Sequence, residues 1–203
     1  MSDLVQIVGH RIVLTPVLKS EIQSVLLPWR NSADFQDLCS NRRNNVDFHA
    51  FEKELAYDFS HDRHEQYLIR KKQNKEPIGT IFSYNYNRVD EYIFVTTYIS
   101  EPFQGAVYGA EAHALMLRQL FERHHLHKVY CDVYGHNTLS LRTLKNAGYQ
   151  IEGSFREHCK NRDNSRSDLI RLSIFSSQKK TVIDFVDRIT KAKFAIQPFI
   201  LSS

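Results

Sequence analysis

The sequence is poor in the residues that mark special classes of protein. Among 203 residues there are 3 cysteines, 5 prolines and 7 glycines, too few for a disulfide scaffold, a collagen-like repeat or a flexible linker. Cys39, Cys131 and Cys159 have no Cys-x-x-Cys spacing, so we interpret them as reduced thiols. No apolar run approaches 18 residues, and no basic stretch precedes an apolar one near the N-terminus. We therefore predict a cytoplasmic protein without a signal peptide or a membrane partner.

Composition predicts one soluble domain. The chain is 42% hydrophobic, 12% aromatic and 25% charged, which excludes disorder and gives enough material for one sizeable core. The net charge of +4 is uneven, because residues 101–203 hold 15 Lys and Arg against 10 Asp and Glu. This half would attract an anionic ligand. No zinc-finger spacing or RNP-type aromatic block accompanies the charge, so we do not expect a nucleic-acid partner.

The N-terminal half favours strands separated by short helices. Apolar residues recur at helical spacing at Phe48, Phe51, Leu55 and Phe59, which predicts a helix over 47–59. A shorter helix over 21–27 would end near Pro28. Residues 29–43 show no clean period. We expect strands over residues 9–18, 66–71, 77–85 and 91–100.

The C-terminal half alternates helices and strands. An apolar stripe formed by Ala110, Ala114, Leu117 and Phe121 predicts a helix of about four turns. A second helix begins at 136–138 and stops at Gly148. A final amphipathic helix covers 181–190, followed by an apolar tail over 194–201. We expect strands over residues 128–134, 149–155 and 168–175.

The most informative segment is Ser100–Ala112, SEPFQGAVYGAEA, which joins a strand to a helix through a loop with two glycines. Such a junction presents backbone N–H groups at a helix N-terminus, where the helix dipole favours an anion such as a pyrophosphate. The alternative is that the glycines serve only the steric needs of a turn.

A second segment, VYCDVYGHNTLSLRTLKNAGYQIEGSFRE, supplies a strand, an Asn-x-x-Ser, a helix, a Gly-Tyr and a Glu-Gly-x-x-Arg in order. Together the two segments resemble the GNAT superfamily of acyl-CoA N-acyltransferases, most closely the ribosomal-protein N-terminal acetyltransferase branch. The resemblance covers residues 9–175 and is best over Pro102–Glu111 and Asn137–Arg156. It implies an α/β (α+β) fold with one GNAT-like domain over 1–175. A mixed, mostly antiparallel sheet of six or seven strands would be flanked by helices, with a C-terminal helix and tail over 176–203 packed on the same domain.

The resemblance also implies acetyl-CoA as co-substrate. In relatives the strand before the loop is bulged and its backbone holds the pantetheine; the corresponding segment is Thr97–Ser100. The loop departs from the family pattern at Val107, where a glycine is usual and where a β-branched residue disfavours positive φ. A weakened CoA site or a different acyl donor would follow. The expected cofactor-binding residues are Tyr98, Ile99, Gln104, Gly105, Ala106, Val107, Tyr108, Gly109, Ala110 and Asn137.

Acyl transfer to an amine needs a neutral amine, a donor for the developing oxyanion and a proton source for the leaving thiolate. By resemblance, Ser140 would face the sulfur as proton donor. Glu91 is the carboxylate available on the strand for the role of general base. Each has a structural alternative: Ser140 as a solvated first-turn serine, Glu91 as an exposed strand end, and Asn137 as a helix N-cap. Other candidates for moving the proton are Asp132, Glu152, Tyr134, Tyr149 and water.

The resemblance places the acceptor between the N-terminal helices and the last strand pair. Trp29, Arg30 and Arg156 are the expected substrate-binding residues, with a structural tryptophan and a merely solvated basic loop as alternatives. His124, His125 and His127 form a metal-like cluster with poor ligand spacing, which a helix C-terminus explains more simply. We therefore expect no metal.

The leading hypothesis is an N-acetyltransferase that transfers an acetyl group from acetyl-CoA to a primary amine by direct attack. The amine would belong to a protein N-terminus, an amino sugar or a small molecule. The rival is a GNAT-fold module that binds an acyl-CoA or a partner without turnover. A third hypothesis concerns the apolar helix face formed by Val182, Phe185, Val186 and Ile189. This face would either pack on the rest of the domain or form a homodimer.

Overall fold

The computed structural model describes residues 5–39, 42–105 and 107–194, and its centre is a mixed sheet of eight strands. Their order is β1-β2-β3-β4-β5-β6-β8-β7. Neighbouring strands are antiparallel except β5 and β6, which run parallel. The expected six or seven strands were too few because β1, only two residues long, pairs with β2 across a tight turn. The strands are β1 (Ile7–Val8), β2 (Ile12–Pro16), β3 (Arg63–Lys71), β4 (Pro77–Asn87), β5 (Tyr92–Ile99), β6 (Lys128–Tyr134), β7 (Gln150–Lys160) and β8 (Arg166–Phe175).

The helices follow the apolar periodicity, with two corrections. The helix expected to end near Pro28 continues to Arg30, because Pro28 lies in the first turn of α2, where its missing N–H removes no helical hydrogen bond. α3 was not predicted at all. The helices are α1 (Lys19–Glu21), a π-helical turn (Ile22–Leu26), α2 (Leu27–Arg30), α3 (Ala33–Leu38), α4 (Phe48–His61), α5 (Tyr108–Arg123), α6 (Thr138–Asn146) and α7 (Lys179–Phe194), with 3-10 turns at Glu101–Phe103 and Ser176–Gln178.

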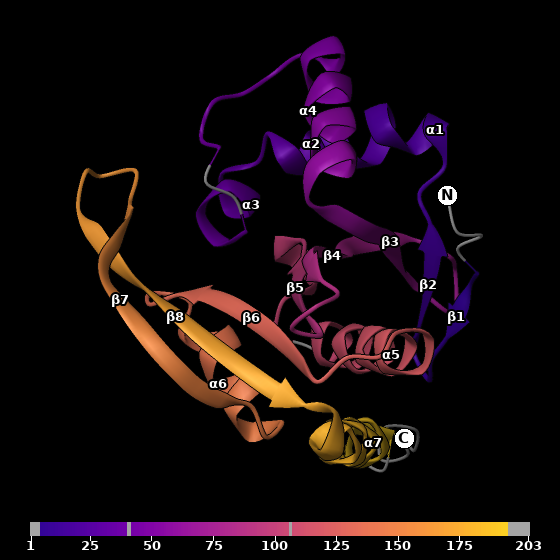
Figure 1. Ribbon diagram of the computed structural model, residues 1–203. Helices are drawn as coiled ribbons and strands as arrows, with labels where there is room; N and C mark the ends of the chain where they lie inside the picture. The colour runs from indigo at the N-terminus through magenta and orange to yellow at the C-terminus, as the bar shows by residue number, and fades with distance from the viewer. Residues whose placement is uncertain (1–4, 40–41, 106, 195–203) are drawn as a thin grey trace, which may run out of the picture.

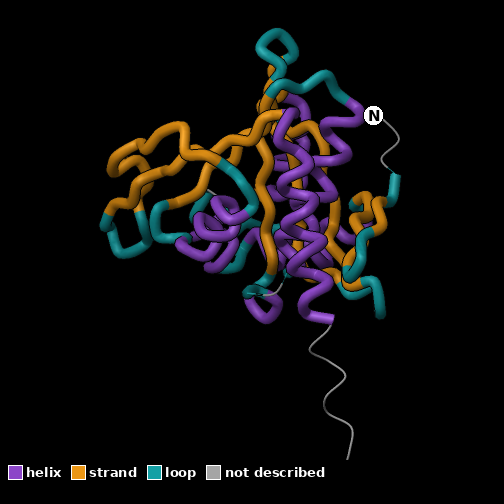
Figure 2. The backbone as a smooth tube through the Cα atoms, turned by 90° about the horizontal axis from the view of Figure 1, so that it is seen from below, coloured by secondary structure: helices purple, strands orange, loops and turns teal. Residues whose placement is uncertain are grey.

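The helices form two groups around the sheet. In Figure 1, α1 to α4 lie above the strands, and α5 and α7 lie below them. Figure 2, from below, shows α5 and α7 running side by side across the sheet, in agreement with their packing contacts. Ile12, Ile81, Ile93, Met116 and Leu117 are fully buried in the main core beneath the sheet. Among the described helices, none combines the length and apolar character that a membrane span requires.

The C-terminal helix belongs to this core. Val182 and Val186 on α7 are buried in it, and Phe185 packs against it. The apolar face of α7 therefore packs on the body, and a homodimer stays a prediction without support from this face. Residues 195–203, which contain most of the expected apolar tail, lie outside the described residues.

The sheet opens between β5 and β6. Their parallel pairing covers three residue pairs, from Tyr92–Lys128 to Phe94–Tyr130. Beyond Phe94, β5 stays in unbroken register with β4 as far as Ile99, so the expectation of a bulge at Thr97–Ser100 was wrong. The irregularity between β4 and β5 lies at the other end, between Tyr84 and Asn87. The opening between β5 and β6 therefore comes from the divergence of these two parallel strands and not from a bulge in β5.

Candidate active site

A cavity of about 220 Å³ lies where β5 and β6 diverge; we call it the narrow cavity. The strands contribute the second half of β5 and the middle of β6. The N-terminal end of α5 and one side of α6 line it from the helices, and α7 closes it. Residues that line the narrow cavity include Val95 to Ile99, Gln104, Gly105, Gly109, Ala110, His113, Cys131 to Val133, Asn137, Ser140, Thr143 and Phe185.

The segment before α5 combines a glycine in the left-handed region with a helix start that no side chain caps. Gly105 has φ of +74° with open space where a Cβ would stand, a backbone conformation that glycine adopts most readily. Val107 is the N-cap of α5, and no side chain caps the helix there. The first N–H groups of a helix without a side-chain cap are free to meet an anion.

Val107 is compatible with this loop. Its φ is −73° in the helical region, and its side chain is buried. The expected conflict between a β-branched residue and positive φ therefore does not arise, since Gly105 and not Val107 carries the left-handed turn.

Gln104 fixes the start of the loop. Its side-chain amide donates to both carboxylate oxygens of Asp34, at 3.1 and 2.9 Å, and to the carbonyl oxygen of Ile99 at 3.0 Å. Asp34 lies in the first turn of α3. The loop is thereby tied both to the end of β5 and to the helix group above the sheet.

Asn137 and Ser140 meet at the start of α6. The Asn137 side chain accepts a hydrogen bond from the Ser140 backbone N–H at 3.1 Å, so Asn137 is the N-cap of α6. Both residues also line the narrow cavity. The structural and functional interpretations of Asn137 are therefore compatible.

Some of the site residues predicted from the sequence line the narrow cavity, and others do not. Tyr108 and Val107 do not line it, and Ala106 lies outside the described residues. The predicted residues that the structure brings together around the narrow cavity are Tyr98, Ile99, Gln104, Gly105, Gly109, Ala110, Asn137 and Ser140.

A larger cavity of about 1030 Å³, the wide cavity, lies on the other side of β5. It is lined by α2 to α4, by β3 to β6 and by the hairpin that joins β7 to β8. Its lining holds six Lys or Arg and four Asp or Glu, namely Arg30, Arg42, Arg43, Arg63, Lys160, Arg162, Glu54, Asp58, Asp62 and Asp132.

Two of the three expected substrate-binding residues line the wide cavity. Arg30 is only 4% exposed; its guanidinium donates twice to Glu54 at 2.9 Å and once to the Asn44 carbonyl. These bonds hold α2 against α4. Trp29 packs edge to face on Tyr98, and burial raises the pKa of the Tyr98 phenol.

Two predicted residues stand away from both cavities. Glu91 is exposed in the turn before β5, at the opposite end of that strand from Ile99. Its backbone carbonyl instead accepts from His127 and Lys128. Arg156 is exposed on β7 and lines neither cavity. Arg162, near the tip of the same hairpin, does line the wide cavity and donates to Gln36 and Asp37.

The two cavities share Leu38, Cys39, Thr96 and Asp132. Asp132 accepts from Arg171 through both carboxylate oxygens at 2.8 Å, and this pairing raises the pKa of Arg171. Tyr84 lines the wide cavity nearby, and burial raises the pKa of its phenol. In the sequence, Asp132 was one of several candidates for moving the proton. Its position between the two cavities depends on the divergence of β5 from β6, which local sequence does not reveal.

The thiols near this junction remain protonated. Burial raises the pKa of Cys131 to about 12 and also raises the pKa of Cys39. A cysteine nucleophile reacts as the thiolate. Neither side chain is therefore suited to form an acyl-enzyme.

A buried histidine joins three elements beside the narrow cavity. His113 on α5 lies 2.6 Å from the Tyr149 hydroxyl through Nε2 and 3.2 Å from Thr97 Oγ1 through Nδ1. Burial lowers the pKa of His113 to about 4 and raises the pKa of Tyr149. A neutral imidazole has one N–H and one acceptor nitrogen, so His113 donates to one of these two hydroxyls and accepts from the other. His113 gave no sequence signal, because it lies on the apolar face of an amphipathic helix.

The family model described as "Acetyltransferase (GNAT) domain" matches residues 11–150. No curated protein sequence matches.

Solved structures share the fold at low identity. A spermidine N-acetyltransferase from Vibrio cholerae, in complex with CoA and spermine, is 17% identical, with a TM-score of 0.74 over 85% of this chain and 99% of that one. A GCN5-related N-acetyltransferase from Brucella melitensis is 16% identical, with a TM-score of 0.73 over 91% and 84%. A GNAT-family acetyltransferase from Bacillus anthracis is 15% identical, with a TM-score of 0.69 over 85% and 99%. Because the family model matches more than half of the chain, the protein belongs to the GNAT family of acetyltransferases and is an acyltransferase.

Proposed function

We propose that the protein transfers an acetyl group from acetyl-CoA to a primary amine by direct attack. The observation that carries the proposal is the junction of the two cavities at Thr96 and Asp132. A donor in one cavity and an acceptor in the other would meet at these residues.

The narrow cavity suits the donor. The N-terminal end of α5, opened by Gly105, fits a pyrophosphate. The diverging edge of β5 beyond Phe94 offers backbone groups to an amide-containing arm. When bound, acetyl-CoA would supply a thioester whose carbonyl carbon accepts the amine.

The residues at the junction suit transfer without an acyl-enzyme. The amine nitrogen forms a bond to the acetyl carbon while the bond from that carbon to sulfur breaks. Ser140 donates a proton to the leaving sulfur, and the Asp132 carboxylate orients the incoming amine. The proton that the amine loses passes to Asp132 or to water, and a proton from water returns to Ser140, so that the products are the N-acetylated amine and the free thiol.

The wide cavity favours an acceptor that carries an anionic group beside its amine. Six arginines and lysines face four carboxylates in its lining. Arg30, Arg42 and Arg63 pair with Glu54 or Asp58, and Arg43 and Arg162 pair with Asp37, so it is the net positive charge of the lining that favours an anion. A polyamine, such as the spermine bound by the Vibrio cholerae relative, would need a lining with a net negative charge. Amino sugar phosphates and small amino acids meet the requirement better. A peptide N-terminus with nearby acidic residues also fits.

The test is release of free CoA thiol from acetyl-CoA in the presence of four classes of amine: amino sugar phosphates, amino acids, acidic peptides and spermidine. We expect turnover with an anionic acceptor and little with spermidine. Retained CoA, detected by mass spectrometry of the purified protein, would report binding independently. Saturable CoA binding with no thiol release from any class would instead favour the non-catalytic binding module.

A further inference from the structure

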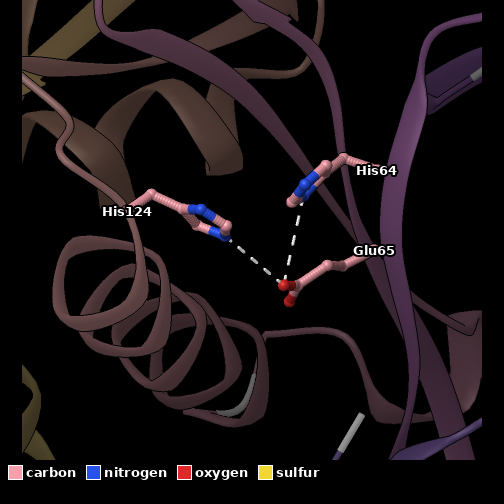
Figure 3. Close-up of side chains that lie close together, drawn as sticks. All are labelled: His64, Glu65 and His124. Carbon is pink, nitrogen blue, oxygen red and sulfur yellow. Dashed lines mark ion pairs between the residues drawn. The ribbon is translucent and has the colours of Figure 1, made fainter. Parts of the chain in front are cut away.

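A cluster of two histidines and a glutamate lies outside both cavities. His64 and Glu65 belong to β3, and His124 is the residue at which α5 ends. Figure 3 shows the three side chains pointing toward one another. Because α5 has sixteen residues, the cluster lies about 24 Å along the helix from the loop that precedes it. Its role is therefore separable from acyl transfer.

A β-bulge creates the cluster. Arg63 pairs with Tyr84 and Glu65 pairs with Ser83, so His64 is an extra residue in β3. Successive residues of a regular strand point to opposite faces of the sheet. A bulge redirects a side chain, and here it lets two adjacent residues face the same helix end.

The facing atoms have the spacing of metal ligands. Oε1 of Glu65 lies 4.0 Å from Nδ1 of His64 and 3.7 Å from Nε2 of His124, too long for hydrogen bonds. All three atoms are buried and have no hydrogen-bond partner in the described part of the chain. Zinc bonds to nitrogen and oxygen of 2.0–2.2 Å place tetrahedral ligand atoms about 3.4 Å apart. The three atoms lie within 4.8 Å of one another, so shifts of up to about 1 Å would bring them to this spacing.

The surroundings fix these side chains. Glu65 is 1% exposed, and the Tyr67 hydroxyl donates to its other oxygen, Oε2, at 3.4 Å. The Tyr86 ring packs against both imidazoles, with ring centres 5.1 and 5.2 Å apart. Such supporting contacts orient ligands before a metal arrives.

We propose that His64, Glu65 and His124 bind a zinc ion that ties the β3 bulge to the C-terminal end of α5. Two histidines and one carboxylate are a common zinc set, with the fourth position open to water. Arg123 is the competing cation, because its Nη1 lies 3.6 Å from the same glutamate oxygen.

The experiment uses the full chain without a histidine tag, stripped of metal by a chelator and titrated with zinc against a chromogenic chelator. We expect one equivalent of tight binding and a tetrahedral visible spectrum with cobalt. His64→Gln and His124→Gln, at partly exposed positions, should each weaken zinc binding by about 100-fold or more. The matched control is His125→Gln, one residue away and exposed, which should leave affinity unchanged.

Arg123→Gln separates a metal site from a metal-free ion-pair cluster. If zinc competes with Arg123 for Glu65, this substitution should tighten zinc binding several-fold and enlarge the rise in melting temperature that zinc causes. Absence of stoichiometric binding to the parent protein, or equal loss in the His125 variant, would overturn the proposal. CoA binding by the same metal-free samples would test the acetyltransferase assignment separately.

Discussion

Asp132 and Arg171 form an ion pair with two hydrogen bonds, both of 2.8 Å. Asp132 lines both the wide and the narrow cavity. The guanidinium of Arg171 also lies over the rings of Phe94 and Phe155, at 4.8 and 5.2 Å. The arginine is therefore held from several sides, and it fixes the carboxylate in turn.

Asp132→Asn should lower kcat by about 100-fold while the Kd for acetyl-CoA stays within about twofold. The reason is that the substitution removes a negative charge where the amine must be oriented, while the loop that would bind pyrophosphate is unchanged. Steady-state kinetics and calorimetric titration measure the two quantities. Asp163→Asn, exposed in the hairpin loop, is the control. An unchanged kcat in the Asp132 variant would remove this residue from the mechanism.

Gly109→Leu should weaken acetyl-CoA binding at least tenfold, about 1.4 kcal/mol. A Cβ at this position already meets Ile99 at 3.3 Å, and the rest of the side chain would fill the narrow cavity. Calorimetric titration with acetyl-CoA measures the effect. Gly153→Leu adds the same side chain where a Cβ meets nothing within 4 Å. The affinity of this variant for acetyl-CoA should therefore match that of the parent protein. If the Gly109 variant binds normally, the donor does not use this loop.

Ser140→Ala should lower kcat by about 100-fold with little change in KM for the acceptor, because it removes the proton donor for the leaving sulfur. The rate should fall less with a donor whose thiol leaves more easily. Thr138→Ala deletes a hydroxyl from the first, exposed residue of the same helix and serves as control. Equal rates for parent and Ser140 variant would assign the serine a purely structural role.

The buried His113 should make the protein less stable in mild acid. Its folded pKa of about 4 lies below the unfolded value of 6.5, so the unfolded chain binds the extra proton between these values. Stability from this group is therefore complete above pH 6.5 and is lost as pH falls toward 4, by about 3 kcal/mol in all.

The test compares the parent with His113→Gln in urea unfolding at pH 7 and pH 5. The pH dependence of the unfolding free energy should be smaller in the variant, because the other histidines contribute equally to both proteins. The same dependence in both would contradict a depressed pKa at His113.

Local patterns predicted most of the fold. The stripe from Ala110 to Phe121 lies on α5, the alternation around Cys131 is a strand with that residue buried, and Gly148 with φ of +100° follows α6. The exception is α3, which has six residues, a buried Gln36 and no apolar period. Its contacts with the distant hairpin, such as Arg162 to Asp37, are invisible in local sequence.

The lining of the narrow cavity could be predicted where it depends on a continuous loop, and less well where it depends on packing between distant residues. The loop from Gln104 to Gly109 is continuous in sequence, and most of its described residues do line the narrow cavity. Asp132 and Arg171 are brought together by strand pairing across 39 residues. In the sequence, His124 was considered as a metal ligand together with His125 and His127. Its partners in space are His64 and Glu65, which lie at a β-bulge about sixty residues earlier.

The short parallel pairing of β5 with β6, three residue pairs long, leaves the two parts of the sheet, within the described residues, without backbone hydrogen bonds to each other beyond Phe94. A donor bound between these strands would contact both parts of the sheet and so stabilise the folded chain. By mass action, a donor present at 100 times its Kd would add about 2.7 kcal/mol to the free energy of unfolding. The state of this protein that resists unfolding best is then the one loaded with its donor.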